Sequence, residues 1–351
     1  MKKPKTSDMG SVPDLRVEGD GRPSANVTLT DVARVAGVSP ITVSRAINRP
    51  DIVSSRTLKQ VTQAIERIGY VPNLLAGALR SNRTRLVAAI VPSIGTSMFA
   101  EAVEALSDRL SEAGYEVLLG LSGFNQVHED EILSAALSRK PDAIFLTGIQ
   151  HSAWARKQLL AARIPVVESW DLTPSPIDMV VGFSHDGSGR AAARHLLSKG
   201  YRRFAVIAAT DHRALQRRDG FLAELEDQGT KAAVILTHTP GSLELGRNAF
   251  AQLLEDGIQP EAVFCTSDPL AQGVIIEGQV RGVSVPGDIA VMGFGDFSFA
   301  AHIHPTLSTV RFDRRQIGRI AAEAILAELN GMPSVERIVD IGFTVMERES
   351  T

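Results

Sequence analysis

The stretch "GVSPITVSRAINRPDIVSSRT", Gly37 to Thr57, decides how the N-terminal part of this 351-residue chain folds. Its Ser39-Pro40 pair is a strong helix start, because the Ser39 hydroxyl can accept a hydrogen bond as N-cap and Pro40 has the preset φ of a first helical residue. An apolar-periodic segment, residues 30–36, ends at the preceding glycine turn. Helix, tight turn and second helix predict a helix-turn-helix, whose second helix lies in the major groove of DNA.

The second predicted helix, Pro40–Asn48, carries hydroxyls and an arginine near the end that faces the bases in such an arrangement. Thr30 and Ser44 are placed to reach phosphates, and Arg45 either reads a guanine or holds a phosphate. The residues expected to contact DNA from this head are Thr30, Ser39, Pro40, Ile41, Thr42, Ser44, Arg45 and Asn48. The alternative is a plain three-helix bundle, completed by Ser55–Ile68, in which these side chains are ordinary surface residues.

The charges are divided unevenly along the chain. Residues 1–85 hold fourteen Lys and Arg against seven Asp and Glu, and subtracting these from the totals of 37 and 40 leaves 23 basic and 33 acidic residues for the remainder. A basic head before an acidic body indicates that one end meets a polyanion. A solvated basic surface would give the same count, so the charge supports DNA binding without deciding it.

Composition excludes several classes of protein. Hydrophobic residues make up 44% and charged residues 22% of the chain, and no run approaches the roughly 18 apolar residues of a membrane span. Residues 1–26 are polar and lack the apolar segment of a secretory signal, so we expect a disordered tail and a cytoplasmic protein. The single cysteine, Cys265, excludes an internal disulfide and is expected to be a core residue.

After Thr84 the sequence alternates short apolar runs with longer helical segments. The expected strands are 86–91, 116–120, 143–147, 166–168, 179–182, 204–209, 233–237, 262–265 and 290–294. The expected helices between them include 101–113, 129–139, 189–199, 217–227, 243–255 and 270–281. Alternation of this kind builds parallel sheets with right-handed crossovers. The expected fold class is therefore α/β, with two doubly wound lobes after a helical head.

Ordered motifs along the chain resemble one known family. The segments "TLTDVARVAGVSPITVSRAIN" and "VSSRTLKQVTQAIERIGYVPNLLAGALRSNRT" look like the headpiece and hinge of the lactose-repressor (LacI) family of bacterial transcription regulators. The similarity continues through "MFAE", "DGFLAEL", "FCTSDPLAQG", "VPGDIAVMGF" and "PTLSTV" to the C-terminus. Within the family, "IPVVESWDLTPSPIDMVVGF" and "DIGFTVMERES" are most similar to gluconate-type repressors.

The resemblance implies a hinge helix at "NLLAGALR", which folds on the operator and inserts Leu79 into the minor groove. Asn73 is also expected to contact DNA. The properties of this segment are consistent with that role, because so short a helix is marginally stable alone in water and an inserted apolar side chain kinks a base step. The alternative is that Leu79 docks on the body.

The resemblance further implies a homodimer that reads a near-palindrome. The expected domains are a tail at 1–26, a head at 27–70, a hinge at 71–83 and a body at 84–351. Within the body, the first lobe is expected at about 84–183 and 310–332, and the second at about 184–309 and 333–351.

The two lobes are similar to a periplasmic sugar-binding fold, in which a ligand occupies the cleft between them. Ligands of doubly wound sheets lie beyond the carboxyl ends of the strands. The candidates at such positions are Ser93, Phe99, Glu168, Trp170, Asp171, Arg213, Arg217, Ser267, Asp268 and Asp296. The effector-binding arginine of the family falls on Arg217. Aromatic and hydroxyl groups suit a polyol and guanidinium groups suit an anion, so the expected effector is a sugar acid such as gluconate or a phosphorylated sugar acid.

One departure from the family bears on the ligand. Many members carry an aspartate directly after the aromatic residue of the "GF" strand end, where this chain has Gly295, with Asp296 one place later. The change favours an anionic ligand, which a carboxylate at that position would repel. A regulator that responds to a neutral sugar or a nucleobase is the alternative.

Two other classes of protein share features with this sequence, a dinucleotide-binding enzyme and a periplasmic solute receptor. "GSGRAA", residues 187–192, matches a loose dinucleotide-binding pattern. Asp211 follows at the end of the next strand, about where the ribose-binding acid of such an enzyme would lie. Because the pattern does not open the sheet, these glycines are interpreted as a tight strand-to-helix turn, and no enzyme activity, cofactor or metal is expected. His302 and His304 are interpreted as loop residues. A periplasmic solute receptor lacks the DNA-binding head.

Overall fold

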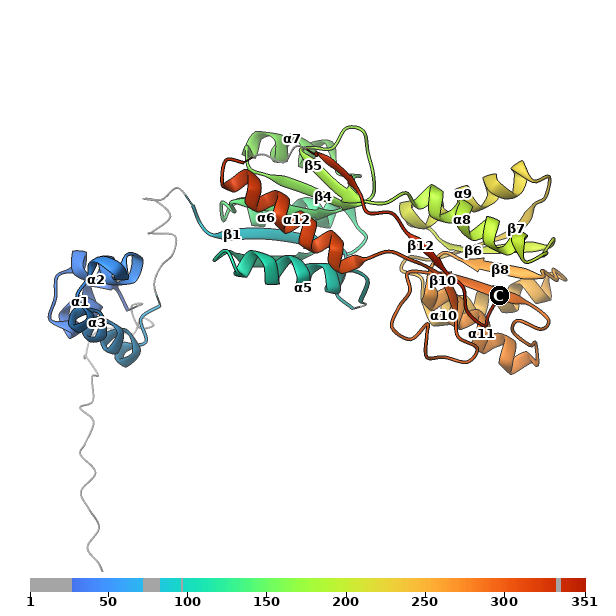
Figure 1. The fold of residues 1–351 in the computed structure, drawn as a ribbon, viewed down its shortest axis with the longest axis horizontal. Helices are drawn as coiled ribbons and strands as arrows, with labels where there is room; N and C mark the ends of the chain where they lie inside the picture. The colour runs from blue at the N-terminus through green and yellow to red at the C-terminus, as the bar shows by residue number, and fades with distance from the viewer. Residues whose placement is uncertain (1–26, 72–82, 96, 333–335) are drawn as a thin grey trace, which may run out of the picture. The chain divides into compact units, whose positions relative to one another are not determined.

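A computed structural model describes residues 27–71, 83–95, 97–332 and 336–351. The chain divides into two units, one ending at Asn82 and the other beginning at Arg83. The expected helical head and α/β body are confirmed (Figure 1). The expected tail at 1–26 and most of the hinge, with Asn73 and Leu79, lie outside the described residues. In the part that the structure describes, no helix is both long and apolar enough to cross a bilayer.

The head contains three α-helices, as expected. They are α1 (Leu29–Ala36), α2 (Pro40–Asn48) and α3 (Ser55–Ile68), with a 3-10 turn at Pro50–Ile52 before α3. The Ser39 hydroxyl accepts from the Thr42 amide at 3.2 Å, and Gly37 ends α1 with φ 65°. That left-handed conformation suits glycine. The helices enclose a small core of Val32, Ala33, Val43, Ala46, Val61, Ala64 and Tyr70.

The body alternates strands and helices throughout. Its strands are β1 (Leu86–Val91), β2 (Glu116–Leu121), β3 (Ala143–Thr147), β4 (Val166–Trp170), β5 (Met179–Gly182), β6 (Phe204–Ala209), β7 (Ala232–Thr237), β8 (Ala262–Cys265), β9 (Ala290–Phe294), β10 (Ser308–Arg311), β11 (Ile338–Asp340) and β12 (Thr344–Met346). Its helices are α5 (Ser97–Ser111), α6 (Gln126–Leu137), α7 (Ala153–Ala162), α8 (His185–Ser198), α9 (His212–Asp227), α10 (Leu243–Glu255), α11 (Asp268–Arg281) and α12 (Arg314–Leu329).

The strands form two six-stranded sheets, one in each lobe (Figure 1). The first has the order β11-β5-β4-β3-β1-β2, and the second the order β12-β10-β9-β8-β6-β7. Every neighbouring pair is parallel except β10 and β12. In the first lobe α5 and α12 cover one face and α6 and α7 the other, while α8 and α9 lie opposite α10 and α11 in the second. Two doubly wound lobes are therefore confirmed.

The chain crosses between the lobes three times, and at two of these crossings the lobe boundary lies at a different position in the sequence from the one expected. β10 extends the second sheet to Arg311, and β11 pairs with β5 in the first sheet. Residues 310–311 therefore belong to the second lobe and 338–340 to the first. Hydrogen-bonded pairing between strands distant in sequence sets these boundaries, and α12, β10, β11 and β12 were not among the expected elements.

Two helices of the second lobe begin earlier than expected because a side chain caps each of them. Ser184 accepts from the Gly187 amide and α8 begins at His185, so Gly187 and Gly189 lie inside the helix, which corrects their interpretation as a turn. Asp211 accepts from the Ala214 amide, and α9 begins at His212. Arg213 and Arg217 are consequently helical residues four apart, on one face of α9, rather than strand-end loop residues.

Candidate ligand cleft and nucleic-acid interface

The start of α2 presents its polar residues to solvent. Ser39, Pro40, Ile41, Arg45 and Asn48 are exposed, and Thr42 and Ser44 are half-buried. Ile41 is 64% exposed. Thr30 is exposed on α1. The expected DNA-contacting residues of the head thus lie at the surface, and the Arg45 guanidinium makes no hydrogen bond or ion pair to any residue that the structure describes.

A cavity of about 110 Å³ lies between the two lobes of the body. Five of the expected effector residues line it: Phe99, Trp170, Arg213, Arg217 and Ser267. The first two come from the first lobe and the other three from the second. The Phe99 and Trp170 ring centroids are 5.0 Å apart. The expected aromatic platform and the two expected guanidinium groups therefore meet in one place.

Arg217 is a buried cation held in a fixed position. It is 7% exposed, its Nε donates to the Thr266 carbonyl at 3.1 Å, and its Nη1 donates to His185 Nδ1 at 2.9 Å. Its guanidinium carbon lies 4.0 Å from the centroid of the Phe294 ring. Burial lowers the pKa of Arg217 to about 10, although Asp211 acts in the opposite direction. Within the described residues, no carboxylate comes within ion-pair distance of this guanidinium.

Arg213 is oriented by a neighbour that does not itself line the cavity. Its Nη1 lies 3.6 Å from Asp171 Oδ2, and its guanidinium carbon lies 5.7 Å from the centroid of the Phe99 ring. Asp171 is 3% exposed and its Oδ1 is 4.0 Å from His185 Nε2. Burial raises the pKa of Asp171, and Arg213 opposes that shift. Asp171 thus positions Arg213 at the cavity wall.

Three polar atoms of cavity-lining residues lack a hydrogen-bond partner among the residues that the structure describes: Trp170 Nε1, His185 Nε2 and Ser267 Oγ. Because Arg217 donates to His185 Nδ1, the neutral His185 ring carries its proton on Nε2. Burial, followed by the charge of Arg217, lowers the pKa of His185 well below its ordinary value. Buried donors without acceptors are costly, and oxygen atoms of a polyhydroxy ligand would satisfy them.

Two of the expected effector residues of the first lobe lie away from the cavity. The Ser93 hydroxyl accepts from the Gly95 amide at 3.0 Å. Glu168 accepts from the Ile177 amide at 2.6 Å, and its other oxygen lies 3.5 Å from His151 Nε2. Because consecutive strand residues point to opposite faces, the end of β4 turns Glu168 toward α6 and α7. Strand-end position alone does not indicate this orientation.

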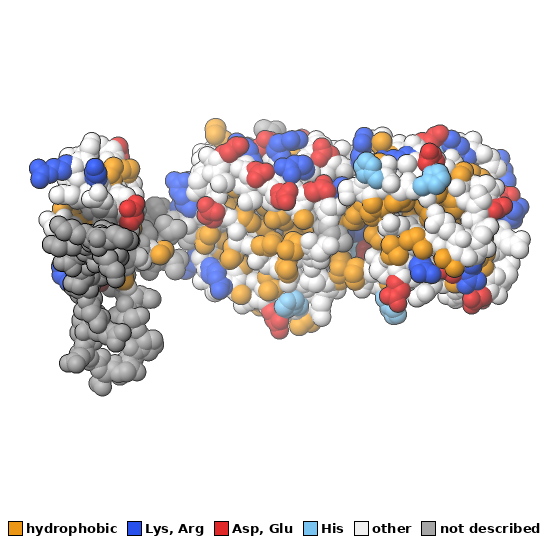
Figure 2. Space-filling view, turned by 90° about the horizontal axis from the view of Figure 1, so that it is seen from below, with side chains coloured by type: hydrophobic (Ala, Val, Ile, Leu, Met, Phe, Trp, Pro, Cys, Tyr) orange, Lys and Arg blue, Asp and Glu red, His pale blue; other side chains and the backbone are white. Residues whose placement is uncertain are grey.

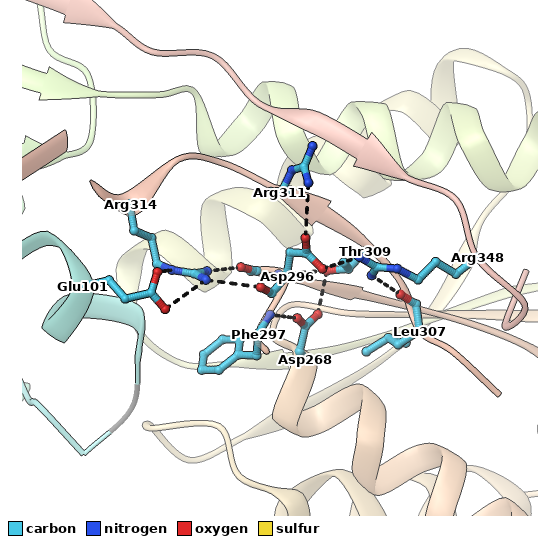
Figure 3. Close-up of polar contacts among 10 residues, drawn as sticks. Glu101, Asp268, Asp296, Phe297, Leu307, Thr309, Arg311, Arg314 and Arg348 are labelled. Atoms are coloured by element: carbon cyan, nitrogen blue, oxygen red, sulfur yellow. Dashed lines mark hydrogen bonds and ion pairs between the residues drawn. The ribbon is translucent and has the colours of Figure 1, made fainter. Parts of the chain in front are cut away.

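Two expected effector residues of the second lobe also have other partners (Figure 3). Asp268 accepts from Thr309 Oγ1 at 2.6 Å and from the Phe297 amide at 2.7 Å. Burial raises the pKa of Asp268 to about 6, and the hydrogen bond from Thr309 opposes the shift. Asp296 forms an ion pair with Arg348 at 2.7 Å. Both carboxylates organise the turn after β9 and do not line the cavity.

Glu168 belongs to a buried ion-pair cluster with Glu129 and His151. Glu129 Oε1 lies 2.6 Å from His151 Nδ1, and the His151 side chain is 2% exposed. Burial disfavours protonation of His151, but Glu129 and Glu168 together raise its pKa to about 9. The imidazolium therefore joins α6, the loop after β3 and β4 at neutral pH.

This raised pKa predicts a pH-dependent stability. Folding favours protonated His151, so its contribution is complete below the unfolded-state pKa of about 6.5 and is lost as pH rises through 9. We expect the urea midpoint of the wild type to fall between pH 6.5 and 9.5 more steeply than that of His151→Gln, which does not titrate. Equal slopes for the two proteins would contradict the ion-pair assignment.

Several lining residues were not among the sequence candidates. They are Met98, Phe124, His185, Ala209, Asp211, Ala214, Pro240, Gly241, Thr266, Pro269, Phe294 and Phe297. Phe294 and Asp211 end or follow expected strands, so the strand-end rule could have found them. His185 had no such signal, because its role depends on Arg217, 32 residues further along the chain. The structure also gives the suspected dinucleotide-binding residues other roles, since the pattern lies in α8 and Asp211 caps α9.

A helix-turn-helix head followed along the chain by a two-lobed body with a cavity between its lobes indicates a DNA-binding transcription regulator. The family model for bacterial regulatory proteins of the lacI family matches residues 28–73, and that for a periplasmic binding protein-like domain matches residues 193–351. The chain belongs to the LacI family of bacterial regulatory proteins. The resemblance indicated by the sequence motifs is thereby confirmed.

Individual relatives agree along nearly the whole chain. The HTH-type transcriptional regulator GntR of Pseudomonas aeruginosa is 40% identical over 96% of this chain and 98% of its own, which agrees with the likeness to gluconate-type repressors. A LacI-family regulator from Silicibacter pomeroyi superposes with a TM-score of 0.87 at 32% identity, over 92% of this chain and 99% of that one. The lac repressor dimer bound to operator has a TM-score of 0.80 at 24% identity, over 93% and 99% of the chains, and shares the fold.

Proposed function

We propose that this protein is a homodimeric, cytoplasmic repressor whose affinity for operator DNA is controlled by a sugar acid in the cleft between the lobes. The observation that carries the ligand class is Arg217, a buried guanidinium at the cavity wall without a carboxylate partner in the described part of the chain. A buried charge is costly unless it is paired. A carboxylate or phosphate of the ligand supplies the missing charge.

The remaining groups at the cavity suit a hydroxylated ligand. Phe99 and Trp170 provide aromatic surface, and Trp170 Nε1 and His185 Nε2 provide donors for hydroxyl oxygens. Gluconate, a ketogluconate and 6-phosphogluconate combine an anionic end with a row of hydroxyls. A neutral sugar uses the hydroxyl sites but leaves Arg217 unpaired, so it is expected to bind more weakly.

The size of the cavity connects ligand binding to a change in shape. Its volume of about 110 Å³ is below the roughly 300–1,000 Å³ of ordinary ligand pockets. A six-carbon acid therefore requires movement of the lining side chains or of the two lobes. A ligand that favours one arrangement of the lobes changes operator affinity by the same factor by which DNA changes ligand affinity.

The exposed start of α2 is the part of the head proposed to bind the operator. Asn73 and Leu79 in the proposed hinge contribute further contacts. Ser39, Thr42 and Ser44 present hydroxyls near Arg45, a combination that can bind phosphates and base edges. The proposed DNA contacts are Thr30, Ser39, Pro40, Ile41, Thr42, Ser44, Arg45, Asn48, Asn73 and Leu79.

Arg45→Ala tests base reading by the head. If Arg45 makes a bidentate contact to a guanine, its loss weakens binding to the selected operator by about 1–3 kcal/mol, or roughly 5- to 150-fold. Binding to random DNA should weaken much less. Fluorescence anisotropy at matched salt, with an operator selected from random duplexes by the wild-type protein, measures both. Arg34→Ala, which removes an exposed arginine of α1, is the control. Equal losses on both DNAs would show that Arg45 only contacts phosphate.

The homodimer is supported by apolar surface on the body. Leu119 and Leu121 on β2, and Val234 and Leu236 on β7, are 37–52% exposed, and both strands lie at sheet edges. Apolar side chains gather over both lobes on the face shown in Figure 2. Exposed apolar edge strands are usually covered in native proteins. A second copy of the chain supplies that cover and also brings a second head to the operator.

A further inference from the structure

A single arginine joins the two lobes beside the cavity. Arg314 is the first residue of α12, and its side chain is 9% exposed. Its Nε lies 2.9 Å from Glu101 Oε2 on α5 of the first lobe. It also donates to the Gly295 carbonyl and, at 3.2 Å, to the Asp296 carbonyl, both just after β9 of the second lobe. Figure 3 shows Arg314 between Glu101 and the backbone of Asp296.

The turn that Arg314 binds is held firmly from the other side. Gly295 has φ 122° and Asp296 has φ 46°, so both lie in the left-handed region, which is strained for an aspartate. The Asp296 carboxylate binds Arg348 at 2.7 Å, and the Phe297 amide donates to Asp268 at 2.7 Å. The two carbonyls therefore move with the second lobe as a fixed unit.

The cavity wall is built from the same two elements. α5 contributes Phe99 to the cavity and Glu101 to the ion pair. The turn after β9 contributes Phe297 to the cavity and two carbonyls to Arg314. The Arg314 guanidinium carbon also lies 5.9 Å from the centroid of the Phe297 ring. A ligand that moves α5 away from the turn after β9 therefore also separates the groups that Arg314 holds together.

We propose that Arg314, bridging Glu101 of the first lobe and the Gly295–Asp296 carbonyls of the second, is a latch that transmits occupancy of the cleft to the lobe arrangement. The proposal rests on the proposed function, because the cleft is the effector site. Arg314 does not line the cavity, so it acts by positioning. The planar guanidinium suits this task, since its several donors bind a carboxylate and two carbonyls at once.

The chain offers a matched control in the next residue. Arg315 pairs with Glu104 at 3.4 Å and with Asp108 at 3.2 Å, and both partners lie on α5. Arg315 therefore joins α12 to α5 within the first lobe, whereas Arg314 also reaches the second. Glu101→Gln is a second test variant, because it removes the charge from the latch while retaining the shape of the side chain.

The first measurement requires no ligand. Spin labels at Lys157→Cys on α7 and Asp256→Cys after α10 report the distance between the lobes in the full chain, and the buried Cys265 does not compete for label. We expect a broader or longer distance distribution in Arg314→Ala and Glu101→Gln than in the unsubstituted labelled protein and Arg315→Ala. Identical distributions in all four proteins would overturn the latch.

The second measurement tests transmission. The ratio of operator Kd with and without saturating D-gluconate is about 5- to 150-fold for a coupled regulator, and it should fall toward 1 in Arg314→Ala and Glu101→Gln but not in Arg315→Ala. An unchanged ratio in both latch variants would also overturn the proposal. If gluconate leaves the wild-type operator Kd unchanged, the proposed ligand is wrong, while the ligand-free distances still decide on the latch.

Discussion

Arg217→Ala is expected to abolish the response of operator binding to the effector while leaving operator binding without effector intact. The guanidinium is buried, lines the cavity and has no carboxylate partner within the described residues. Removing it leaves the charge of a bound sugar acid unpaired, which costs about 2–5 kcal/mol, or roughly 30- to 5,000-fold in affinity. Arg217 lies outside the head, so the DNA contacts themselves remain.

Calorimetric titration with D-gluconate and with neutral D-glucose measures this effect. The wild type should prefer gluconate, and Arg217→Ala should lose most of that preference. Arg218→Ala is the matched control, because the neighbouring arginine pairs with Asp219 and does not line the cavity. A wild type that prefers glucose, or a variant that binds gluconate as well as the wild type does, would overturn the sugar-acid assignment.

Gly189→Ala is expected to destabilise the body by about 3 kcal/mol, at the upper end of the usual effect of overpacking. A Cβ at Gly189 would lie 1.9 Å from the Arg217 carbonyl oxygen, so the backbones of α8 and α9 must separate. Gly220 meets the Asp186 carbonyl in the same way, at 2.2 Å. Two glycines thus allow these helices to pack closely, and the contact is with Arg217 itself.

The consequence for function follows from the hydrogen bond between the two helices. His185 on α8 accepts from Arg217 on α9 at 2.9 Å, and separating the helices breaks this geometry. We therefore expect Gly189→Ala to lower the urea midpoint and to weaken gluconate binding together. Gly187→Ala is the comparison, because its Cβ meets side chains and no backbone: Ser184 at 3.0 Å and Phe343 at 3.5 Å. If both variants are as stable as the wild type, close packing of α8 on α9 is not required.

The sequence by itself determined the local structure and the order of the elements. Ser39 and Pro40 define the start of α2 because capping depends on neighbours within one turn. Apolar runs identify strands, and the nine strands that were predicted lie close to their observed bounds. Seven of them are buried, whereas the edge strands β2 and β7 are part-exposed. The family motifs then predicted which domain follows which, and they predicted that Arg217 binds the effector; the structure places Arg217 at the cavity.

Only the tertiary structure decided which strand-end side chains meet. Phe99, Trp170 and the two arginines converge at the cavity, whereas Glu168 pairs with His151 and Asp296 with Arg348. His185 and Arg314, which no pattern indicated, act through partners far away in the sequence. The physical reason is that a local pattern fixes the element on which a residue lies, while its orientation and partners depend on the packing of elements that the chain joins by distant crossovers.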